Sequence, residues 1–120
     1  MTEQRLSLGR WGEQQAVRYL KRRLYRIIET NYRAPTGEID IIARRGKMLA
    51  FVEVKTRSGI QCGEAVEAVN ARKQRQIIRT AQWYLAKHGQ SSLQPRFDVI
   101  AIQADETSHD LKHLKDAFSL

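Results

Sequence analysis

The alternation of hydrophobic and polar positions predicts two helices and four strands. In residues 8–24 and again in residues 70–88, apolar side chains recur at helical spacing and form one stripe along each segment. Runs that are rich in β-branched and aromatic residues predict strands over residues 25–33, 38–44, 48–56 and 96–103. The tail after residue 104 is compatible with either an edge strand or a helical turn.

This order of elements predicts an α/β (α+β) fold with a mixed sheet flanked by helices. The 120 residues suffice for one hydrophobic core, so we expect a single domain over residues 1–120. No run of about 18 apolar residues is present, which argues against a membrane span. The first residues lack the apolar segment of a signal peptide, and Cys62 is the sole cysteine, so we expect a cytoplasmic protein.

The segment 37–57 predicts a β-hairpin with one apolar and one charged face. If the turn holds an even number of residues, Ala43 lies opposite Met48 and Asp40 lies opposite Phe51. Because side chains alternate along a strand, the apolar face would consist of Ile39, Ile41, Ala43, Ala50, Val52 and Val54. The opposite face would carry Glu38, Asp40, Phe51, Glu53 and Lys55.

The charged face suits metal-assisted hydrolysis of a phosphodiester. Asp40 and Glu53 would be diagonal neighbours with Cα atoms about 7–8 Å apart, a spacing at which two carboxylates can share Mg²⁺ or Mn²⁺. Lys55 projects to the same side, where it can orient a water molecule or neutralise charge developing on phosphorus. For Lys55 and Glu53 alone, the alternative is an ion pair on a solvated sheet face.

The charge distribution favours a polyanionic partner. The chain carries 21 Lys and Arg against 13 Asp and Glu, a net charge of +8, which points to nucleic acid before an acidic membrane surface. In the second helix, Arg72, Arg75 and Arg79 lie opposite the apolar stripe, with Trp83 beside them. These arginines would hold phosphates while Trp83 stacks on a base or packs at a protein interface. The alternative is a solvated face on which arginine stems cover the indole.

The chain resembles the UPF0102, or YraN-type, family of small bacterial proteins. The matching stretches are "GRWGEQQAVRYL", "NYRAPTGEIDIIARRGKMLAFVEVKTR", "EAVNARKQRQIIRTAQWYL" and "RFDVIAI", which cover most of the sequence. Within them, "EID" followed by "FVEVK" is similar to the D…(D/E)xK core of the PD-(D/E)xK superfamily, which includes the archaeal Holliday-junction resolvases. The resemblance implies a restriction-endonuclease-like fold and a nuclease-like function on DNA.

The resemblance also implies roles for individual residues. Asp40, Glu53 and Lys55 match the metal-binding and catalytic core, and Glu13 matches the first-helix glutamate that completes this site in resolvase-like members. Glu13 also falls inside the apolar arc of its helix, where a carboxylate needs a partner; the alternative is a partly exposed residue favoured by the helix dipole. Lys73 matches a family lysine and is placed to reach the site from the second helix.

Two functions fit these residues. The first is a Mg²⁺- or Mn²⁺-dependent endonuclease acting on DNA, with branched or damaged DNA as candidate substrates. The second is a non-catalytic nucleic-acid-binding or adaptor protein on a nuclease scaffold. Because symmetric cleavage of a junction needs two active sites, analogy predicts a homodimer. Glu38 is a candidate accessory residue, Asp98 is expected to bond backbone or Arg96, and Cys62 has no basic neighbour that would favour a nucleophilic role.

Overall fold

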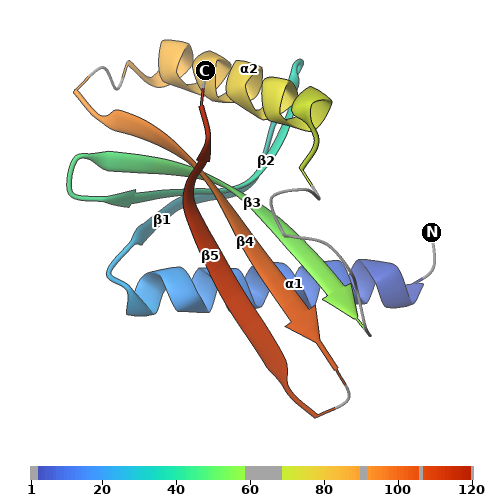
Figure 1. Ribbon diagram of the computed structural model, residues 1–120. Helices are drawn as coiled ribbons and strands as arrows, with labels where there is room; N and C mark the ends of the chain where they lie inside the picture. The colour runs from blue at the N-terminus through green and yellow to red at the C-terminus, as the bar shows by residue number, and fades with distance from the viewer. Residues whose placement is uncertain (1–2, 59–68, 90–91, 106, 120) are drawn as a thin grey trace.

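The protein folds as a five-stranded mixed sheet with one helix against each face (Figure 1). The computed structural model describes residues 3–58, 69–89, 92–105 and 107–119, with side chains described from residue 7 onwards. The elements are α1 (Glu3–Arg22), β1 (Arg26–Ala34), β2 (Gly37–Arg45), β3 (Met48–Ser58), α2 (Ala71–His88), β4 (Gln94–Ala104) and β5 (His109–Phe118). The strands follow the order β1-β2-β3-β4-β5, in which only β3 and β4 run parallel.

This architecture confirms the predicted fold class and decides the conformation of the tail. The sequence leaves the tail after residue 104 open between strand and helix, and His109–Phe118 form β5, which pairs with β4 at the edge of the sheet. Within the described residues, neither helix contains a stretch apolar and long enough to cross a membrane. The segment that contains Cys62 lies outside the described residues.

Helix α1 packs against one face of the sheet, and a glycine allows it to approach β3 closely. Ala16 and Leu20 are fully buried against the apolar side chains of β2, β3 and β4. Nearer the N-terminus, a Cβ at Gly12 would overlap Oγ1 of Thr56 on β3. The absence of a side chain at this position therefore lets the first turns of α1 lie directly on the end of β3.

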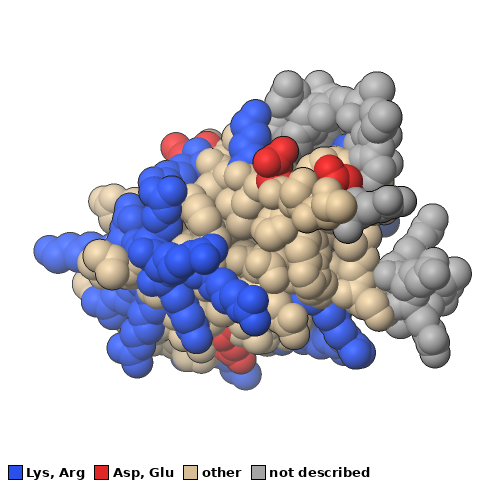
Figure 2. Space-filling model, turned by 90° about the horizontal axis from the view of Figure 1, so that it is seen from below, with Lys and Arg blue, Asp and Glu red and all other residues tan. Residues whose placement is uncertain are grey.

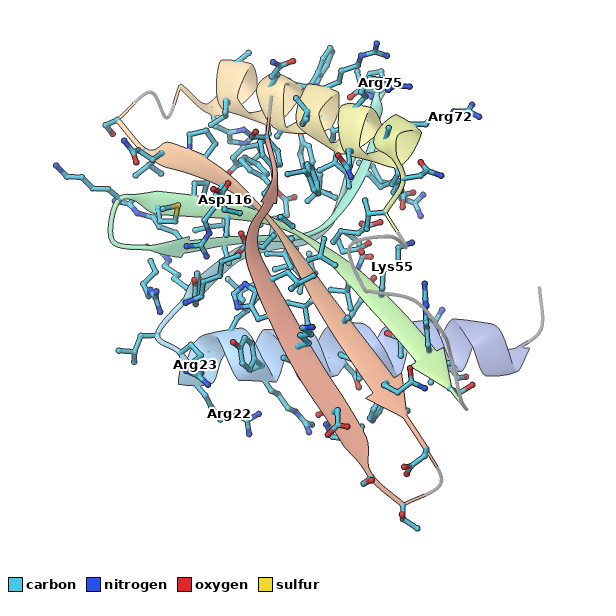
Figure 3. The ribbon with its side chains drawn as sticks, viewed as in Figure 1. Arg22, Arg23, Lys55, Arg72, Arg75 and Asp116 are labelled. Carbon is cyan, nitrogen blue, oxygen red and sulfur yellow. The ribbon has the colours of Figure 1, made fainter. Side chains whose placement is uncertain are left out.

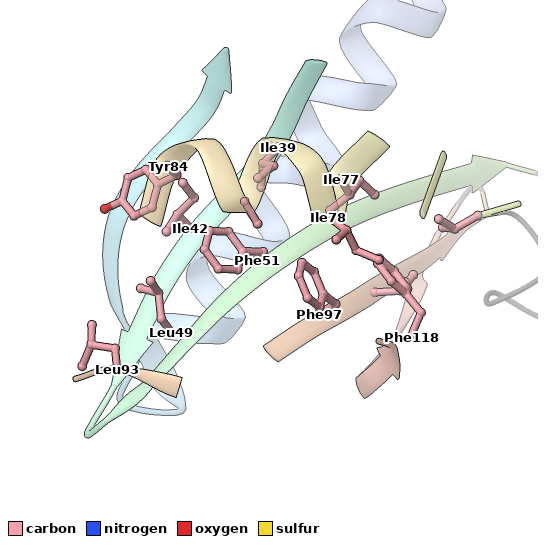
Figure 4. Close-up of a cluster of buried hydrophobic side chains, with 13 residues drawn as sticks. Ile39, Ile42, Leu49, Phe51, Ile77, Ile78, Tyr84, Leu93, Phe97 and Phe118 are labelled. Atoms are coloured by element: carbon pink, nitrogen blue, oxygen red, sulfur yellow. The ribbon is translucent and has the colours of Figure 1, made fainter. Parts of the chain in front are cut away.

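Helix α2 covers the opposite face and begins and ends at recognisable caps. The side chain of Asn70 accepts a hydrogen bond from the backbone N–H of Lys73 (2.9 Å), and Gly89 ends the helix in the left-handed conformation with φ 60°. Between the caps, Ile77 and Tyr84 pack over Phe51 and its neighbours (Figure 4). Both faces of the sheet are therefore apolar over most of their area.

The β2–β3 pairing differs from the predicted register by two residues. Arg45 pairs with Met48, so the turn holds two residues rather than four, and Ala43 faces Ala50 instead of Met48. Gly46 makes this possible because it takes a φ of 61°, which glycine adopts without steric cost. Phe51 consequently lies opposite Ile42 and not opposite Asp40.

The face of the hairpin that carries Phe51, Glu53 and Lys55 is charged only in part. Ile42, Leu49 and Phe51 occupy that face and pack under α2, which confines the polar part to the end of the hairpin away from its turn. Ile39 joins this α2-side cluster, although Ile41 belongs to the cluster under α1. The reason is local, since the regular pairing of β2 with β3 ends at Ile41 and Val52.

Candidate active site

The candidate site lies where β2 separates from β3. At this point Asp40 does not continue the backbone ladder, and its Oδ2 accepts a hydrogen bond from the backbone N–H of Val54 (2.8 Å). The next pair in the observed register would be Asp40 and Glu53, and their side chains share a hydrogen bond. The separation of the strands thus brings two carboxyl groups together at the margin of the apolar core.

Glu53 is the most perturbed acid of this site. Its side chain is only 5% exposed, and burial followed by the charge and hydrogen bond of Asp40 raises its pKa from 4.5 to about 8. The amines of Lys73 and Lys55 oppose this rise, since each Nζ lies 3.7 Å from Oε2 of Glu53. Asp40 and Glu53 repel each other when both are ionised, and a divalent cation between them would stabilise the doubly ionised pair.

Lys55 and Lys73 approach Glu53 from different elements. Lys55 lies two residues along β3, and Lys73 reaches across from the first turn of α2. Both side chains are about one-third exposed, so their amines also face solvent. The low exposure of Glu53 rules out the alternative of an ion pair on a fully solvated sheet face.

Glu13 joins the site from α1. It is half-buried, and burial, then the charge of Asp40, then that of Glu38 raise its pKa, while a hydrogen bond from Asn31 lowers it. Asn31 was not predicted from the sequence, although asparagine tolerates the left-handed conformation that it adopts here (φ 52°). Among the side chains that the structure describes, no three from His, Cys, Asp and Glu are arranged as a ready metal-binding group.

Glu38 stands apart from the buried pair. Its carboxylate forms an exposed ion pair with Nε of Arg33 (3.0 Å), across the β1–β2 hairpin. Its charge contributes to the raised pKa of Glu13, and it lines a shallow hollow together with Lys73. The geometry thus brings Asp40, Glu53 and Lys55 together and leaves Glu38 at the periphery.

A basic hollow lies along the first half of α2. Its volume is about 640 Å³, and it is lined by Thr36, Asn70, Arg72, Lys73, Arg75, Gln76 and Arg79. Arg72 and Arg75 project away from the sheet at the end of α2 that lies above Lys55 (Figure 3). Because Lys73 lines this hollow and also contacts Glu53, the basic surface is continuous with the carboxylate pair.

Trp83 lies further along the same helix. The indole is 40% exposed, and it follows Arg75 and Arg79 at intervals of four residues, so the three side chains form one ridge. The predicted placement of the arginines and Trp83 away from the apolar stripe agrees with their exposure.

Asp98 belongs to a separate, structural network. It is fully buried and accepts hydrogen bonds from Nε and Nη2 of Arg96 (2.8 and 2.7 Å), from Nε2 of His113 (2.7 Å) and from the backbone of Asp116 (3.0 Å). Burial alone would raise the pKa of Asp98, but the hydrogen bonds from His113 and Arg96 outweigh it and lower the pKa. The expected structural role, bonding Arg96 and backbone, is confirmed.

Comparison with known proteins gives a consistent result. Residues 12–102 match the model of the family described as "Uncharacterised protein family UPF0102". The chain is similar to a UPF0102 protein of Syntrophotalea carbinolica, with 55% identity over 100% of this chain and 98% of the relative. It is also similar to UPF0102 proteins of Geotalea uraniireducens (50% identity, 95% of this chain and 91% of the relative) and Desulfosudis oleivorans (46% identity, 98% and 94%).

Proposed function

This chain belongs to the UPF0102 family, and we propose that it is a divalent-cation-dependent endonuclease that hydrolyses phosphodiester bonds in DNA. One observation carries the proposal. The half-buried carboxyl of Asp40 and the buried carboxyl of Glu53 lie together, with the amines of Lys55 and Lys73 each 3.7 Å from Glu53, and Lys73 also lines the basic hollow. Carboxylates beside exposed amines on a basic surface suit the chemistry of a phosphodiester.

The residues present fit Mg²⁺ or Mn²⁺. Asp40 and Glu53 would hold the cation, and Glu13 would act from the side of α1, since its carboxyl lies within electrostatic reach of Asp40. Two carboxylates are enough for Mg²⁺, which keeps several water ligands and uses substrate phosphate as a further ligand. A bound cation supplies a Lewis acid for a phosphoryl oxygen and lowers the pKa of a coordinated water molecule.

The two lysines would orient water, neutralise negative charge and position the phosphate. Once the charge of Glu53 is balanced by a cation, the amine of Lys55 is available to orient water and to neutralise charge developing on the phosphate. Lys73 lines the basic hollow and contacts Glu53, so it would position the phosphate next to the carboxylates. Lys55 is therefore the proposed catalytic residue and Lys73 a positioning residue.

Helix α2 would bind the nucleic acid through its phosphates. Within the part of the chain that the structure describes, no carboxylate pairs with Arg72, Arg75 or Arg79, so their charges face the hollow and solvent. Such contacts position a nucleic acid without reading its sequence, which favours recognition of backbone and shape. The exposed indole of Trp83 would add stacking on an unpaired base.

A non-catalytic nucleic-acid-binding protein is the second candidate. It is favoured by the lack, among the described side chains, of a ready group of three metal ligands. In that case the basic hollow alone would carry the function, and binding would not depend on the carboxyls. The homodimer and the cytoplasmic location expected from the sequence stay predictions.

The decisive experiment measures cleavage of duplex, flap and four-way-junction DNA with Mg²⁺ or Mn²⁺ and with EDTA. We expect metal-dependent cleavage by the wild type, loss of cleavage in Asp40→Asn, and retention in Glu38→Gln. Glu38 is the matched control because it is an exposed carboxylate on the same strand that pairs with Arg33. No cleavage by the wild type, with tight DNA binding that survives Asp40→Asn, would instead establish the second candidate.

A further inference from the structure

A second basic groove lies on the opposite face of the sheet, between α1 and β1. Its volume is about 590 Å³, and it is lined by Arg10, Glu13, Gln14, Val17, Arg18, Lys21, Thr30 and Asn31. None of these residues except Glu13 belongs to the site proposed above. Figure 2 views the molecule from the α1 side, and Lys and Arg side chains crowd the end of this face where α1 ends.

The basic residues of this groove form one ridge along α1. Arg10 and Arg18 are eight residues apart, and Lys21 follows one turn later, so the three lie on one side of the helix and span about 16 Å. All three are exposed. No carboxylate of the described residues pairs with them, and between residues 7 and 22 the sequence contains a single acid, Glu13.

The opposite wall of the groove contributes neutral polar groups from β1. Thr30 offers a hydroxyl, and Asn31 offers an amide that hydrogen-bonds to Glu13. Hydroxyl and amide groups next to arginine and lysine are the side chains that commonly contact phosphate and sugar oxygens. Glu13, the α1 residue of the candidate site, also lines this groove, so the groove adjoins that site.

We propose that the α1 groove, formed by Arg10, Arg18 and Lys21 with Thr30 and Asn31, binds the sugar-phosphate backbone of the DNA that flanks the cleavage site. This inference rests on the proposed function, and it adds that the substrate is held from both faces of the sheet. The α2 hollow binds backbone on one side of the carboxylates, and the α1 groove binds backbone on the other. A polyanion fits this groove because its positive ridge lacks carboxylate partners among the described residues and its concave wall supplies neutral donors.

The test compares DNA binding by two triple variants in EDTA, so that cleavage does not interfere. The first is Arg10→Gln/Arg18→Gln/Lys21→Gln. The control, Arg26→Gln/Lys47→Gln/Lys115→Gln, removes the same charge from exposed positions that line neither the α1 groove nor the α2 hollow. Affinity for labelled duplex DNA is measured by fluorescence anisotropy over a series of salt concentrations.

We expect the slope of log affinity against log salt to fall by about 0.9 for each duplex phosphate that the groove variant no longer neutralises, and to change less in the control. The charge-preserving variant Arg10→Lys/Arg18→Lys/Lys21→Arg should retain the wild-type slope. Combination with neutralised Arg72, Arg75 and Arg79 should add the two decreases, since the surfaces lie on different faces.

Equal slopes in the groove variant and its control would overturn this inference. Cleavage by the wild type and the effect of the α2 arginines would still test the proposed function independently. Conversely, the groove variant can have a reduced slope while the wild type shows no metal-dependent cleavage. This result would support DNA binding by the groove and refute the proposed endonuclease activity. If the groove variant keeps the wild-type salt slope for DNA but no longer binds anionic phospholipid vesicles, the groove binds a membrane surface. That result would contradict the proposal.

Discussion

The amine of Lys73 lies 3.7 Å from Oε2 of Glu53, and this contact joins the basic helix α2 to the carboxyl pair of Asp40 and Glu53. The same lysine lines the hollow that contains Arg72, Arg75 and Arg79. A phosphate held in the hollow would therefore lie next to the carboxylates and their amines. This connection between a basic surface and an acidic pair distinguishes the site from an ordinary solvated helix face.

Neutralising Lys73 should raise the pKa of Glu53 further. The amine is one of two positive charges that lower this pKa against the larger effects of burial and Asp40. In Lys73→Gln, carboxyl NMR titration of Glu53 should therefore show protonation at a higher pH than in the wild type. Lys87→Gln is the control on the same helix, and an identical titration in Lys73→Gln and wild type would contradict the contact.

The stability of the metal-free protein should depend on pH through Glu53. Its pKa is raised from 4.5 to about 8 by folding, so its contribution to stability is fully present below about pH 4.5. That contribution is lost as pH rises through about 8, because the unfolded chain ionises more readily. The free energy of unfolding in EDTA should thus decrease from pH 5.5 to pH 9.

Glu53→Gln should flatten this decrease because glutamine does not titrate. Urea denaturation at several pH values measures both proteins. A wild-type stability that rises between pH 5.5 and pH 9 would show that Glu53 is ionised at neutral pH in the folded state.

Gly12→Ala should disturb the position of α1 on β3. The added Cβ would overlap Oγ1 of Thr56, and overpacking of this kind costs about 1–3 kcal/mol. Gly9→Ala is the matched control in the same helix, because nothing lies within 4 Å of the place that its Cβ would occupy, and it should stabilise by about 0.5–1 kcal/mol. Removing the obstacle in Gly12→Ala/Thr56→Gly should recover stability if the overlap is the cause.

Asp98→Asn should destabilise the fold without a direct effect on the site. The substitution leaves the guanidinium of Arg96 without its buried counter-charge, a change that costs about 3–5 kcal/mol. Glu29→Gln, an exposed change on β1, should alter the free energy of unfolding by less than about 0.5 kcal/mol. Similar losses of stability in both variants on urea denaturation would argue against the buried network.

The element pattern could be predicted from the sequence because its strands and helices carry clear periodicities and end at turn residues. The register could not, since "RRGK" is compatible with two-residue and four-residue turns and the choice depends on Gly46 taking φ 61°. Side-chain alternation alone places Glu38, Asp40, Phe51, Glu53 and Lys55 on one face of the hairpin. In the fold, Ile42 and Phe51 are buried under α2, and the acids of the hairpin lie at its end away from the turn.

The sequence indicates which residues form the site, but the contacts around them can be described only from the fold. The hydrogen bond from the backbone of Val54 to Asp40 arises because β2 leaves β3 at that point, and no spacing in the sequence reports such a separation. Asn31 carries little sequence signal beyond its tolerance of positive φ. The α1 ridge is visible in the sequence only as the polar side of a helix, because β1 closes the groove beside it in the fold.

The central claim is that Asp40 and Glu53 together bind one divalent cation, and calorimetric titration of Mn²⁺ tests it most directly. At pH 7 in buffers of different ionisation enthalpy, we expect one site per chain and release of close to one proton per cation, because Glu53 with a pKa of about 8 must ionise to bind. Asp40→Asn and Glu53→Gln should each abolish saturable binding at millimolar Mn²⁺, while Glu38→Gln should retain it. Equal Mn²⁺ binding by the wild type and Glu53→Gln, or no saturable binding by the wild type, would contradict the account.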